Sequence, residues 1–299
     1  MTVLETSLPE PFKKVASGKV RDLYDCEEFP SCLLFVATDR ISAYDVIMNN
    51  GIPEKGKILT KISEFWFSLL KEKVQTHIVT SEWNEMPQVI QQHPELKDRC
   101  MLVKKFKILP IEAIVRGYLT GSAWKEYQTH GTVHGIQVPA NMQEGEAFPE
   151  PLFTPSTKAA EGHDENIHPD IMGNIIGEDL AKQVAQTAVE LYKVARNVAL
   201  QKGIIIADTK FEFGVDEATN KVVLVDEVLT PDSSRFWLAA DYKIGSSPDS
   251  FDKQFLRNWL TSNKLNGKPG VSLPEHIIQA TGKKYMDAYE MITGKNWSY

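Results

Sequence analysis

The residues best suited to chemistry lie on one predicted β-hairpin, whose first strand begins at Ile204. Alternate residues of a strand project to the same face, so Asp208, Lys210 and Glu212 share one face of an otherwise apolar strand. Two carboxylates and an ammonium group in such surroundings need water, a metal ion or an anion near them. The strand therefore indicates either a functional site or the solvated face of an edge hairpin.

A second strand at Lys221–Glu227 returns beside the first after a polar turn. If the turn centres near Ala218, Asp226 lies opposite Lys210, whereas a shift of one residue places Glu227 there instead. Either register gathers three acids around one lysine. Carboxylates that share a site repel one another unless a cation neutralises them, and oxygen ligands favour magnesium, with phosphates supplying its other positions. The hairpin thus predicts a magnesium site, with a solvated edge as the alternative.

The segment Ser17–Asp22 is a second candidate for binding phosphate. Gly18 lies between two expected strands, and Lys19 and Arg21 follow it at alternate positions. The backbone amides of such a turn and two cationic side chains can hold phosphate oxygens. The alternative is an ordinary turn with exposed basic residues.

A third candidate is the segment Arg116–Ser122, where an arginine leads into a turn of glycines and hydroxyl residues. We expect a helix to begin near Ser122, which can cap that helix or bind an anion together with the exposed amides. Arg116 can grip a carboxylate or a phosphate through two parallel hydrogen bonds. Arg235, just beyond the hairpin, offers a further guanidinium group.

The elements that position these residues are predicted to be both strands and helices. The stretch Gly18–Thr38 predicts a strand, a turn and a strand. Apolar residues at three- and four-residue steps predict helices at Leu59–Val74 and Glu178–Lys202, the second of which ends at Gly203. Helical spacing returns after Phe251. We therefore expect a sheet-rich N-terminal lobe and a helical tail packed on the outside.

Two segments indicate how the chain divides. Pro110 separates the apolar segments Met101–Leu109 and Glu112–Leu119, and because proline donates no ladder hydrogen bond we expect a crossing between elements and a lobe boundary at Lys104–Pro110. The stretch Val138–Pro169 is too polar and too broken by proline and glycine for a regular element, and long loops are often functional. The predicted parts are a sheet-rich lobe at 1–108, a central lobe with the metal and substrate site at 109–250, and C-terminal helices at 251–299.

The composition is that of an ordinary globular protein. A chain of 299 residues, 42% of them hydrophobic, can bury the core of one large domain or of two packed lobes. A formal net charge of −7 argues against general nucleic-acid binding, which needs a basic face. Cys26, Cys32 and Cys100 form no close metal-binding pair and predict reduced, buried thiols. With no targeting or membrane-spanning pattern, we expect a cytoplasmic protein.

Taken together, these segments resemble the SAICAR synthetase (phosphoribosylaminoimidazole-succinocarboxamide synthase) family of purine biosynthesis. Two family signatures are complete, ILPIEAIVRGYLTGS at Ile108–Ser122 and IIADTKFEFG at Ile205–Gly214. Further blocks match in the same order: SGKVRDLYD, ATDRISAYDVIM, LFTPSTKAAEGHDEN and VDEVLTPDSSRFW. The match runs from about Ser17 to Trp237, and the remaining C-terminal helices resemble the single-function fungal-type form.

The resemblance implies a ligase that joins L-aspartate to phosphoribosyl-aminoimidazole carboxylate (CAIR) while ATP becomes ADP and phosphate. A carboxylate oxygen is a poor leaving group, so ATP would first convert it to an acyl phosphate, which the amine of aspartate then displaces. Such a transfer depends on positioning and on charge neutralisation by magnesium, lysines and arginines. The implied fold is two α+β lobes around an ATP-binding cleft, with an antiparallel sheet in the N-terminal lobe. No protein partner, nucleic acid or membrane is implied.

The resemblance also implies a role for each matching residue. ATP would be bound by Gly18, Lys19, Arg21, Phe106, Ile108 and Lys158. Magnesium would be held by Glu212 and Asp226, which favours Asp226 over Glu227 in the hairpin register. The phosphoribosyl substrate would be bound by Arg116, Ser122, Asp164, Asp208, Lys210 and Arg235, with Lys210 and Asp208 as catalytic residues. Candidates for aspartate are Asp39, Arg40 and Ser42, because an arginine suits a dicarboxylate. The stretch Val138–Pro169 would cover the substrate.

Two other classes of protein stay open on the sequence. A kinase is the first, because Glu-Phe-Gly in the hairpin imitates the kinase metal-binding Asp-Phe-Gly. The chain lacks, however, a full glycine-rich loop and a His-Arg-Asp catalytic loop. A non-catalytic nucleotide-binding module is the second class, and it predicts ATP binding without turnover.

Overall fold

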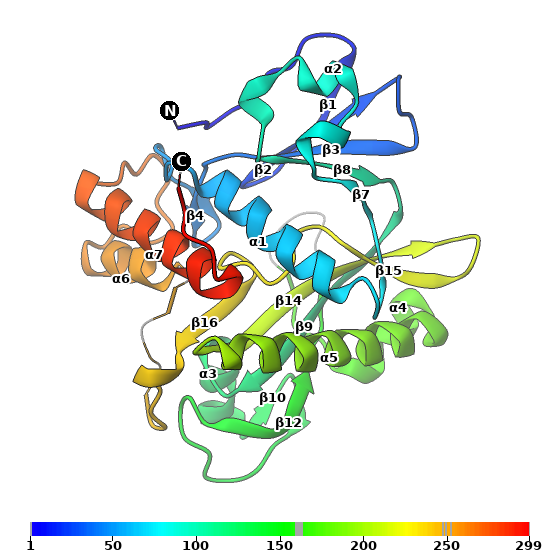
Figure 1. Ribbon diagram of the computed structural model, residues 1–299. Helices are drawn as coiled ribbons and strands as arrows, with labels where there is room; N and C mark the ends of the chain where they lie inside the picture. Colours follow the sequence, from blue (N-terminus) through cyan, green and yellow to red (C-terminus); the bar gives the residue numbers. More distant parts are fainter. Residues whose placement is uncertain (1, 159–163, 247, 249, 252, 299) are drawn as a thin grey trace. The chain divides into compact units, whose positions relative to one another are not determined.

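The computed structural model describes residues 2–158, 164–246, 248, 250–251 and 253–298 (Figure 1). The chain folds into two compact units. The first comprises Met1–Phe67, His77–Lys105 and Phe251–Tyr299, and the second comprises Ser68–Thr76 and Phe106–Ser250. Each unit combines helices with a largely antiparallel sheet, which confirms the predicted α+β class.

This division differs from the predicted bounds in two respects. The segment Ser68–Thr76 belongs to the second unit, although it precedes the last strands of the first. The C-terminal helices form part of the first unit instead of a separate part. The break between Lys105 and Phe106 lies within the predicted boundary range Lys104–Pro110.

An antiparallel sheet of five strands forms the centre of the first unit, in the order β1-β2-β3-β8-β7. The strands are β1 (Phe12–Ser17), β2 (Arg21–Cys26), β3 (Cys32–Ala37), β7 (Ile78–Thr80) and β8 (Cys100–Lys104). Alternate residues of β2 and β3 are buried, among them Tyr24, Leu34 and Val36. This alternation is typical of a sheet with one face on a core, and the predicted strand, turn and strand are present.

Helices and short strands complete the first unit. They are β4 (Ser42–Ala43), β5 (Val46–Ile47), α1 (Lys55–Leu70, whose end from Ser68 belongs to the second unit), η1 (Trp83–Glu85), α2 (Gln88–Gln91), η2 (Pro94–Leu96), α6 (Gln254–Ser262) and α7 (Glu275–Thr293). Helix α1 begins one turn before the predicted start because Ile58 extends the buried stripe of Ile62 and Trp66 toward the N-terminus. The predicted helical tail is present, and α6 and α7 contact each other (Figure 1).

A sheet of seven strands forms the centre of the second unit. Its order is β12-β9-β14-β15-β6, with β13 paired to β9 and β16 paired to β14. The strands are β6 (Gln75–Thr76), β9 (Lys107–Tyr118), β12 (Ala147–Phe153), β13 (Ser156–Thr157), β14 (Ile204–Asp216), β15 (Lys221–Val225) and β16 (Ser234–Leu238). All pairs are antiparallel except β15 with β6. Strand β14 therefore borders three others.

Helix α5 (Glu178–Gln201) lies along this sheet (Figure 1) and contacts β14, β9, β12 and β15. Its predicted apolar stripe is buried, since Val184, Ala188 and Leu191 are at most 1% exposed. The chain leaves the helix at Gly203, whose φ of 78° lies in the left-handed region that favours glycine. The helix predicted from this stripe is confirmed.

Smaller elements complete the second unit. They are α3 (Gly121–His130), β10 (Thr132–Val133), β11 (Ile136–Gln137), η3 (Pro169–Ile171), α4 (Met172–Ile176) and η4 (Ala239–Asp241). No helix within the described ranges has both the length and the apolar character that crossing a bilayer requires.

The predicted crossing at Pro110 is wrong, because this proline lies inside β9. The pairing of β9 with β14 is irregular at this point: Glu212 pairs with Glu112, and the next regular pair joins Gly214 to Ile108. Pro110 therefore falls where the regular ladder is interrupted, and its missing N–H is tolerated there.

The prediction that Val138–Pro169 has no regular element is also wrong, because β12 and β13 lie in this stretch. Strand β12 is at the edge of its sheet, and its register is irregular between Ala147 and Leu152. Both features accommodate the prolines that made the stretch resemble a loop. Residues 159–163, which belong to the same stretch, lie outside the described residues.

Candidate active site

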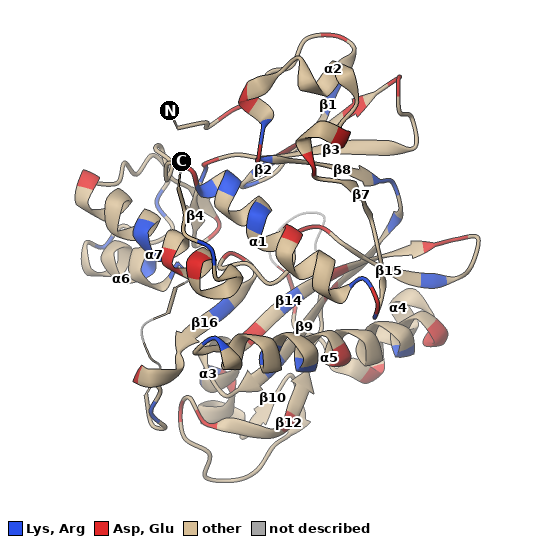
Figure 2. Ribbon diagram, in the orientation of Figure 1, with Lys and Arg blue, Asp and Glu red and all other residues tan. Residues whose placement is uncertain are grey.

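The predicted hairpin is present as β14 and β15, and its faces alternate as expected. Phe211 and Phe213 are at most 1% exposed, whereas Asp208 and Glu212 are half-buried and Lys210 is exposed. Figure 2 shows charged positions of both signs on β14 and the neighbouring β16. One face of β14 therefore packs into the core, and the other presents the charged residues.

The register of the hairpin is the second of the two alternatives. Glu212 pairs with Val225, and this alignment, continued past the end of β15, would set Glu227 opposite Lys210. The pairing of Asp226 with Lys210, which the resemblance favoured, is therefore wrong. Strand β15 ends at Val225, and Asp226 turns out of the ladder with a φ of 65°. Because Asp226 lies outside the strand, its side chain does not have to follow the alternation of the two strand faces.

The acid that contacts Lys210 comes from β9, and the sequence reasoning missed it. Glu112 accepts a hydrogen bond from Lys210 Nζ at 2.6 Å through its Oε2 atom. Strand β9 pairs with β14 so that Glu112 faces Glu212 and Arg116 faces Asp208. The signal in the sequence was the four-residue spacing of Glu112 and Arg116, which places both on one face of an otherwise apolar strand.

Lys158 joins the same site from the segment after β13. Its ammonium group forms an ion pair with Glu212. Burial lowers the pKa of Lys158, but the charge and hydrogen bond of Glu212 and the charges of Asp226 and Glu112 together raise that pKa above the ordinary lysine value. We call Glu112, Lys158, Lys210, Glu212 and Asp226 the acid–lysine cluster.

A second group of charges lies at the other end of the same strands. Asp208 forms an ion pair with Arg235 and lies 3.7 Å from Arg116 Nη1 through its Oδ2 atom. Arg116 is buried and also donates to Ser122 Oγ at 3.3 Å and to Thr154 Oγ1 at 3.0 Å. Two guanidinium groups share one carboxylate, so this arginine group (Arg116, Ser122, Asp208 and Arg235) suits an anion.

Helix α3 begins at Gly121, one residue before the predicted start. Thr120 is the N-cap residue and makes no side-chain capping bond, so the capping role considered for Ser122 is wrong. Gly121 has a φ of 60°, and a Cβ atom there would lie 2.8 Å from Arg235 Nη2. Glycine therefore allows the guanidinium group of Arg235 to lie against the start of the helix.

Two of the remaining predicted residues of the second unit, Phe106 and Ile108, lie at or next to the start of β9. Ile108 is 46% exposed on β9. It pairs with Gly214, where an added Cβ would lie only 3.0 Å from Phe106 Cβ. Asp164 is exposed.

The first unit carries the predicted phosphate-binding turn. Gly18, Lys19 and Val20 connect β1 to β2, and Gly18 N–H donates to Arg21 O at 2.7 Å. Lys19 forms an ion pair with Asp45, and both side chains are more than half exposed. The turn predicted between two strands is therefore present.

The three candidates for binding aspartate are buried in the first unit. Asp39 is fully buried, accepts hydrogen bonds from the amides of Val3 and Gly56, and forms an ion pair with Arg99 at 3.2 Å. Arg40 is 9% exposed and Ser42 is 7% exposed. Their assignment to aspartate stays a prediction that these internal contacts do not support.

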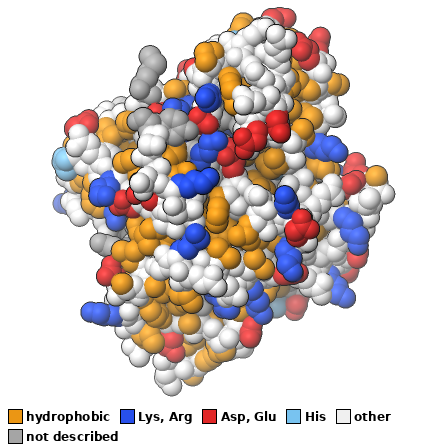
Figure 3. All heavy atoms as spheres, in the orientation of Figure 1, with side chains coloured by type: hydrophobic (Ala, Val, Ile, Leu, Met, Phe, Trp, Pro, Cys, Tyr) orange, Lys and Arg blue, Asp and Glu red, His pale blue; other side chains and the backbone are white. Residues whose placement is uncertain are grey.

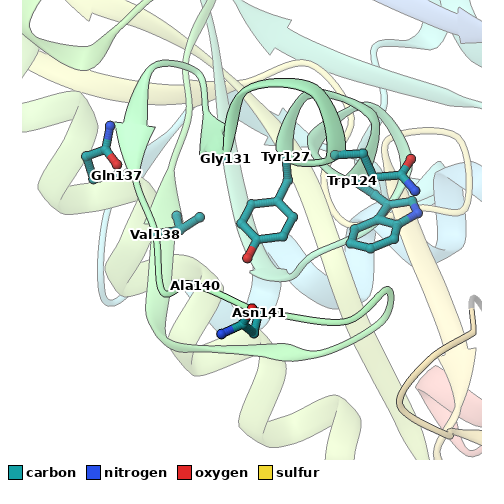
Figure 4. Close-up of a pocket in the computed structure, with 8 residues that line it drawn as sticks. Trp124, Tyr127, Gly131, Gln137, Val138, Ala140 and Asn141 are labelled. Carbon is teal, nitrogen blue, oxygen red and sulfur yellow. The ribbon is translucent and has the colours of Figure 1, made fainter.

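A hollow of about 530 Å³ lies beside α3 (Figure 4). The rings of Trp124 and Tyr127 stack on its wall with centroids 5.9 Å apart. Its other lining residues are neutral as well: Gln128, Gly131, Gln137, Val138, Ala140 and Asn141. A hollow without a cationic wall does not suit phosphates, and none of the predicted site residues lines it.

The donors of the acid–lysine cluster fit a magnesium ion only in part. Within the ranges that the structure describes, no three His, Cys, Asp or Glu side chains are placed to hold a metal ion by themselves. Magnesium is usually held by one or two carboxylates together with substrate phosphates and water. Glu212 and Asp226, both near Lys158, supply such a pair.

The fold and the site define a class of protein. An α+β protein that arranges lysines, arginines and carboxylates along one face of paired strands has the charge pattern of enzymes that neutralise phosphate and carboxylate groups during group transfer. The family model for SAICAR synthetase matches residues 14–273. The chain belongs to the SAICAR synthetase family.

Individual relatives agree with this family over the full chain. The chain is 76% identical to the phosphoribosylaminoimidazole-succinocarboxamide synthase of Schizosaccharomyces pombe and 55% identical to that of Saccharomyces cerevisiae, with 100% of each chain covered. The S. cerevisiae SAICAR synthase solved in complex with SAICAR has a TM-score of 0.92 and 54% identity over 100% of both chains. A SAICAR synthetase solved with ADP, 24% identical over 95% of this chain and 99% of its own, shares the fold with a TM-score of 0.70.

Proposed function

We propose that this protein catalyses the ATP-dependent condensation of L-aspartate with CAIR, giving SAICAR, ADP and phosphate in purine biosynthesis. The observation that carries the proposal is the identity of 76% with the S. pombe synthase over the whole of both chains. The arginine group and the acid–lysine cluster supply the charges that this reaction has to control. This identity favours a ligase over a kinase or a non-catalytic nucleotide-binding module.

The arginine group would hold the phosphoribosyl substrate. Arg116 and Arg235 share Asp208 and so retain one positive charge in surplus. The first turn of α3 adds backbone amides beside Ser122, because the first amides of a helix have no partner within it. A phosphate or carboxylate of the substrate would accept these hydrogen bonds, and Asp208 would keep both guanidinium groups in place.

The acid–lysine cluster would hold the reacting groups and the triphosphate of ATP. Lys210 would neutralise negative charge that develops as the carboxylate of CAIR attacks the γ-phosphorus, and Lys158 would contact the nucleotide phosphates. Glu212 and Asp226 would hold magnesium, which would neutralise the remaining charge of the triphosphate. The amine of aspartate would then displace phosphate from the acyl phosphate to form the amide bond.

ATP binding would also use residues that the family resemblance assigns. Ile108, 46% exposed on β9, and Phe106 would contact the adenine ring, since exposed apolar side chains suit a planar base. Gly18, Lys19 and Arg21 of the turn before β2 would contact the phosphates.

We also propose a cytoplasmic location. Cys26, Cys32 and Cys100 are all free and buried, as expected for thiols in a reducing compartment. Burial, with the nearby charge of Glu64, raises the pKa of Cys100 to about 12, so its thiol stays protonated and unreactive.

One assay separates the three classes of protein. The purified protein is incubated with ATP, magnesium, aspartate and CAIR, phosphate release is followed, and the product is identified by mass spectrometry. The proposal predicts phosphate release that requires both aspartate and CAIR, together with a product of the mass of SAICAR. Release without aspartate would indicate a kinase or phosphatase activity, and absence of release would indicate a binding module; either result contradicts the proposal.

A further inference from the structure

All three guanidinium nitrogens of Arg40 donate hydrogen bonds inside the first unit. It donates to the backbone carbonyls of Leu4 at 2.7 Å, Gly18 at 2.9 Å, Arg21 at 3.1 Å and Lys19 at 3.4 Å, and to Asp22 Oδ1 at 2.8 Å. Three of the four carbonyls belong to the turn between β1 and β2 and its first flanking residue. Arg40 thus bonds to the backbone of the turn itself.

These bonds orient the peptide planes of the turn. In a trans peptide, the C=O of one residue and the N–H of the next point in opposite directions. Because Arg40 holds the carbonyls of Gly18 and Lys19 on its own side, the amides of Lys19 and Val20 point to the other side. Successive amides that share a direction form a concave site for an anion.

Asp22, the residue after Arg21, accepts a hydrogen bond from the same guanidinium group. It is fully buried and accepts from Arg40, from Ser17 Oγ at 2.7 Å and from the backbone and side chain of Thr6 at 3.1 and 2.7 Å. Burial raises its pKa, but the hydrogen bonds from Arg40, Thr6 and Ser17 outweigh burial and hold the pKa well below the usual range for aspartate. Asp22 is therefore ionised at neutral pH and neutralises Arg40.

A guanidinium group that pairs with a buried carboxylate and donates from all three of its nitrogens is poorly suited to bind a substrate dicarboxylate, because a new partner would compete with these existing bonds. We propose that Arg40 is a positioning residue that shapes the Gly18–Arg21 turn for the phosphates of the nucleotide, and that it does not contact the substrate aspartate. This inference rests on the proposed function, in which that turn binds ATP.

The test compares the Michaelis constants for ATP and aspartate in Arg40→Lys. Lysine keeps the positive charge beside Asp22 but cannot make the forked set of bonds to the turn. We expect KM for ATP to rise at least tenfold and the affinity for ADP, measured by calorimetry without other substrates, to fall in parallel. KM for aspartate should stay within twofold of the original value. A rise in KM for aspartate with unchanged KM for ATP, or an equal rise in both, would overturn the inference.

Arg99→Lys is the matched control. Arg99 is a buried arginine of the same unit whose guanidinium group bonds to Ala37 O and Asp39 instead of to the turn. Its replacement should lower the melting temperature without changing the affinity for ADP. If Arg99→Lys weakened ADP binding as much as Arg40→Lys does, general destabilisation would explain the effect and the inference would fail.

A milder variant keeps the test informative if Arg40→Lys does not fold. Ser17→Ala removes one hydrogen bond to Asp22 and should raise KM for ATP two- to fivefold with KM for aspartate unchanged; an unchanged KM for ATP would count against the inference. The assay of the wild-type protein tests the proposed function separately from the role of Arg40. If the wild type releases phosphate only with both substrates, the proposed function holds whatever the Arg40 and Ser17 variants do.

Discussion

At the scale of single residues, the charge balance of the acid–lysine cluster is its most informative property. Glu112 and Glu212 face each other across β9 and β14, and like charges in such positions are destabilising. Lys210 pairs with the first and Lys158 with the second. With Asp226 the cluster holds three acids and two lysines, so it retains a negative charge that a cation can neutralise.

This balance predicts the effect of replacing Glu112, which the sequence reasoning missed. Glu112→Gln removes the charge that holds Lys210, and a lost charge-assisted hydrogen bond of about 1.5–3 kcal/mol corresponds to a roughly 10- to 100-fold lower kcat. Lys210→Ala, which removes the charge-stabilising group itself, should lower kcat by at least about 100-fold. Both are measured by phosphate release with all substrates present.

An ion pair elsewhere on the hairpin provides the control for Glu112. Glu217 lies in the turn between β14 and β15 and pairs with Lys107 at 3.7 Å, with both side chains exposed. Glu217→Gln should leave kcat within twofold of the wild type, because exposed pairs contribute little. An equal loss of kcat in Glu112→Gln and Glu217→Gln would show that the contact of Glu112 with Lys210 is not the cause of the loss.

At the scale of elements, Gly121, the first residue of α3, affects the position of a side chain on β16. Gly121 has a positive φ, and its missing Cβ makes room for Arg235 of β16. Gly121→Ala should therefore displace this guanidinium group and raise KM for CAIR about tenfold, in addition to a loss of about 1–2 kcal/mol in stability from the strained backbone. Steady-state kinetics and thermal unfolding measure the two effects.

The other end of the same helix supplies the matched control. Gly131 ends α3 with a φ of 71°, and nothing lies within 4 Å of a Cβ built there. Gly131→Ala should lower stability by about 1 kcal/mol and leave KM for CAIR unchanged. If both variants raised KM equally, the contact between Gly121 and Arg235 would not be the cause.

The elements also explain which parts of the site the sequence could predict. Alternation within β14 is local, so Asp208, Lys210 and Glu212 could be placed on one face from spacing alone. The pairing of Glu112 with Lys210 joins residues 98 positions apart in the chain, and no pattern in one sequence specifies that β9 lies beside β14. Spacing left two hairpin registers open because it does not define where the turn centres, and the structure has the one that the resemblance did not favour.

Strands that contain proline were the second feature that the sequence predicted wrongly. Pro110 was expected to separate elements, but the irregular pairing near Glu212 and Gly214 accommodates it inside β9. The stretch that holds β12 and β13 was expected to be a loop for the same reason. In both cases irregular pairing with the neighbouring strand makes room for the proline. The strand propensities of single residues do not show where such irregular pairing occurs.

At the scale of the whole molecule, the face in Figure 3 shows lysine and arginine side chains scattered among acidic and hydrophobic ones, and the net charge of the chain is −7. No single sign of charge dominates this face, so the proposed control of charge rests on the local contacts of the acid–lysine cluster and of the Gly18–Arg21 turn.

Stability at mildly acidic pH provides a test at this scale, through His134 of the second unit. Burial, followed by the charge of Arg116, lowers the pKa of this histidine to about 4. In the unfolded chain, with a pKa of about 6.5, the histidine binds a proton more readily than in the folded protein. The contribution of His134 to stability is therefore fully present above pH 6.5 and is lost as the pH falls toward 4, by up to about 3 kcal/mol.

The measurement is thermal unfolding between pH 4.5 and 7.5. His134→Gln retains a donor for Pro155 O, which lies 3.1 Å from His134 Nδ1, but cannot be protonated in this range. The variant should lose less stability than the wild type as the pH falls. Identical pH dependence in both proteins would exclude His134 as the cause.

The proposed metal site is tested most directly by a crystal structure of the protein with manganese in place of magnesium and a non-hydrolysable ATP analogue. We predict an anomalous peak for the ion in contact with the carboxylates of Glu212 and Asp226 and with the phosphates, and Lys210 beside the γ-phosphate. An ion bound elsewhere, with both carboxylates directed into solvent, would contradict it.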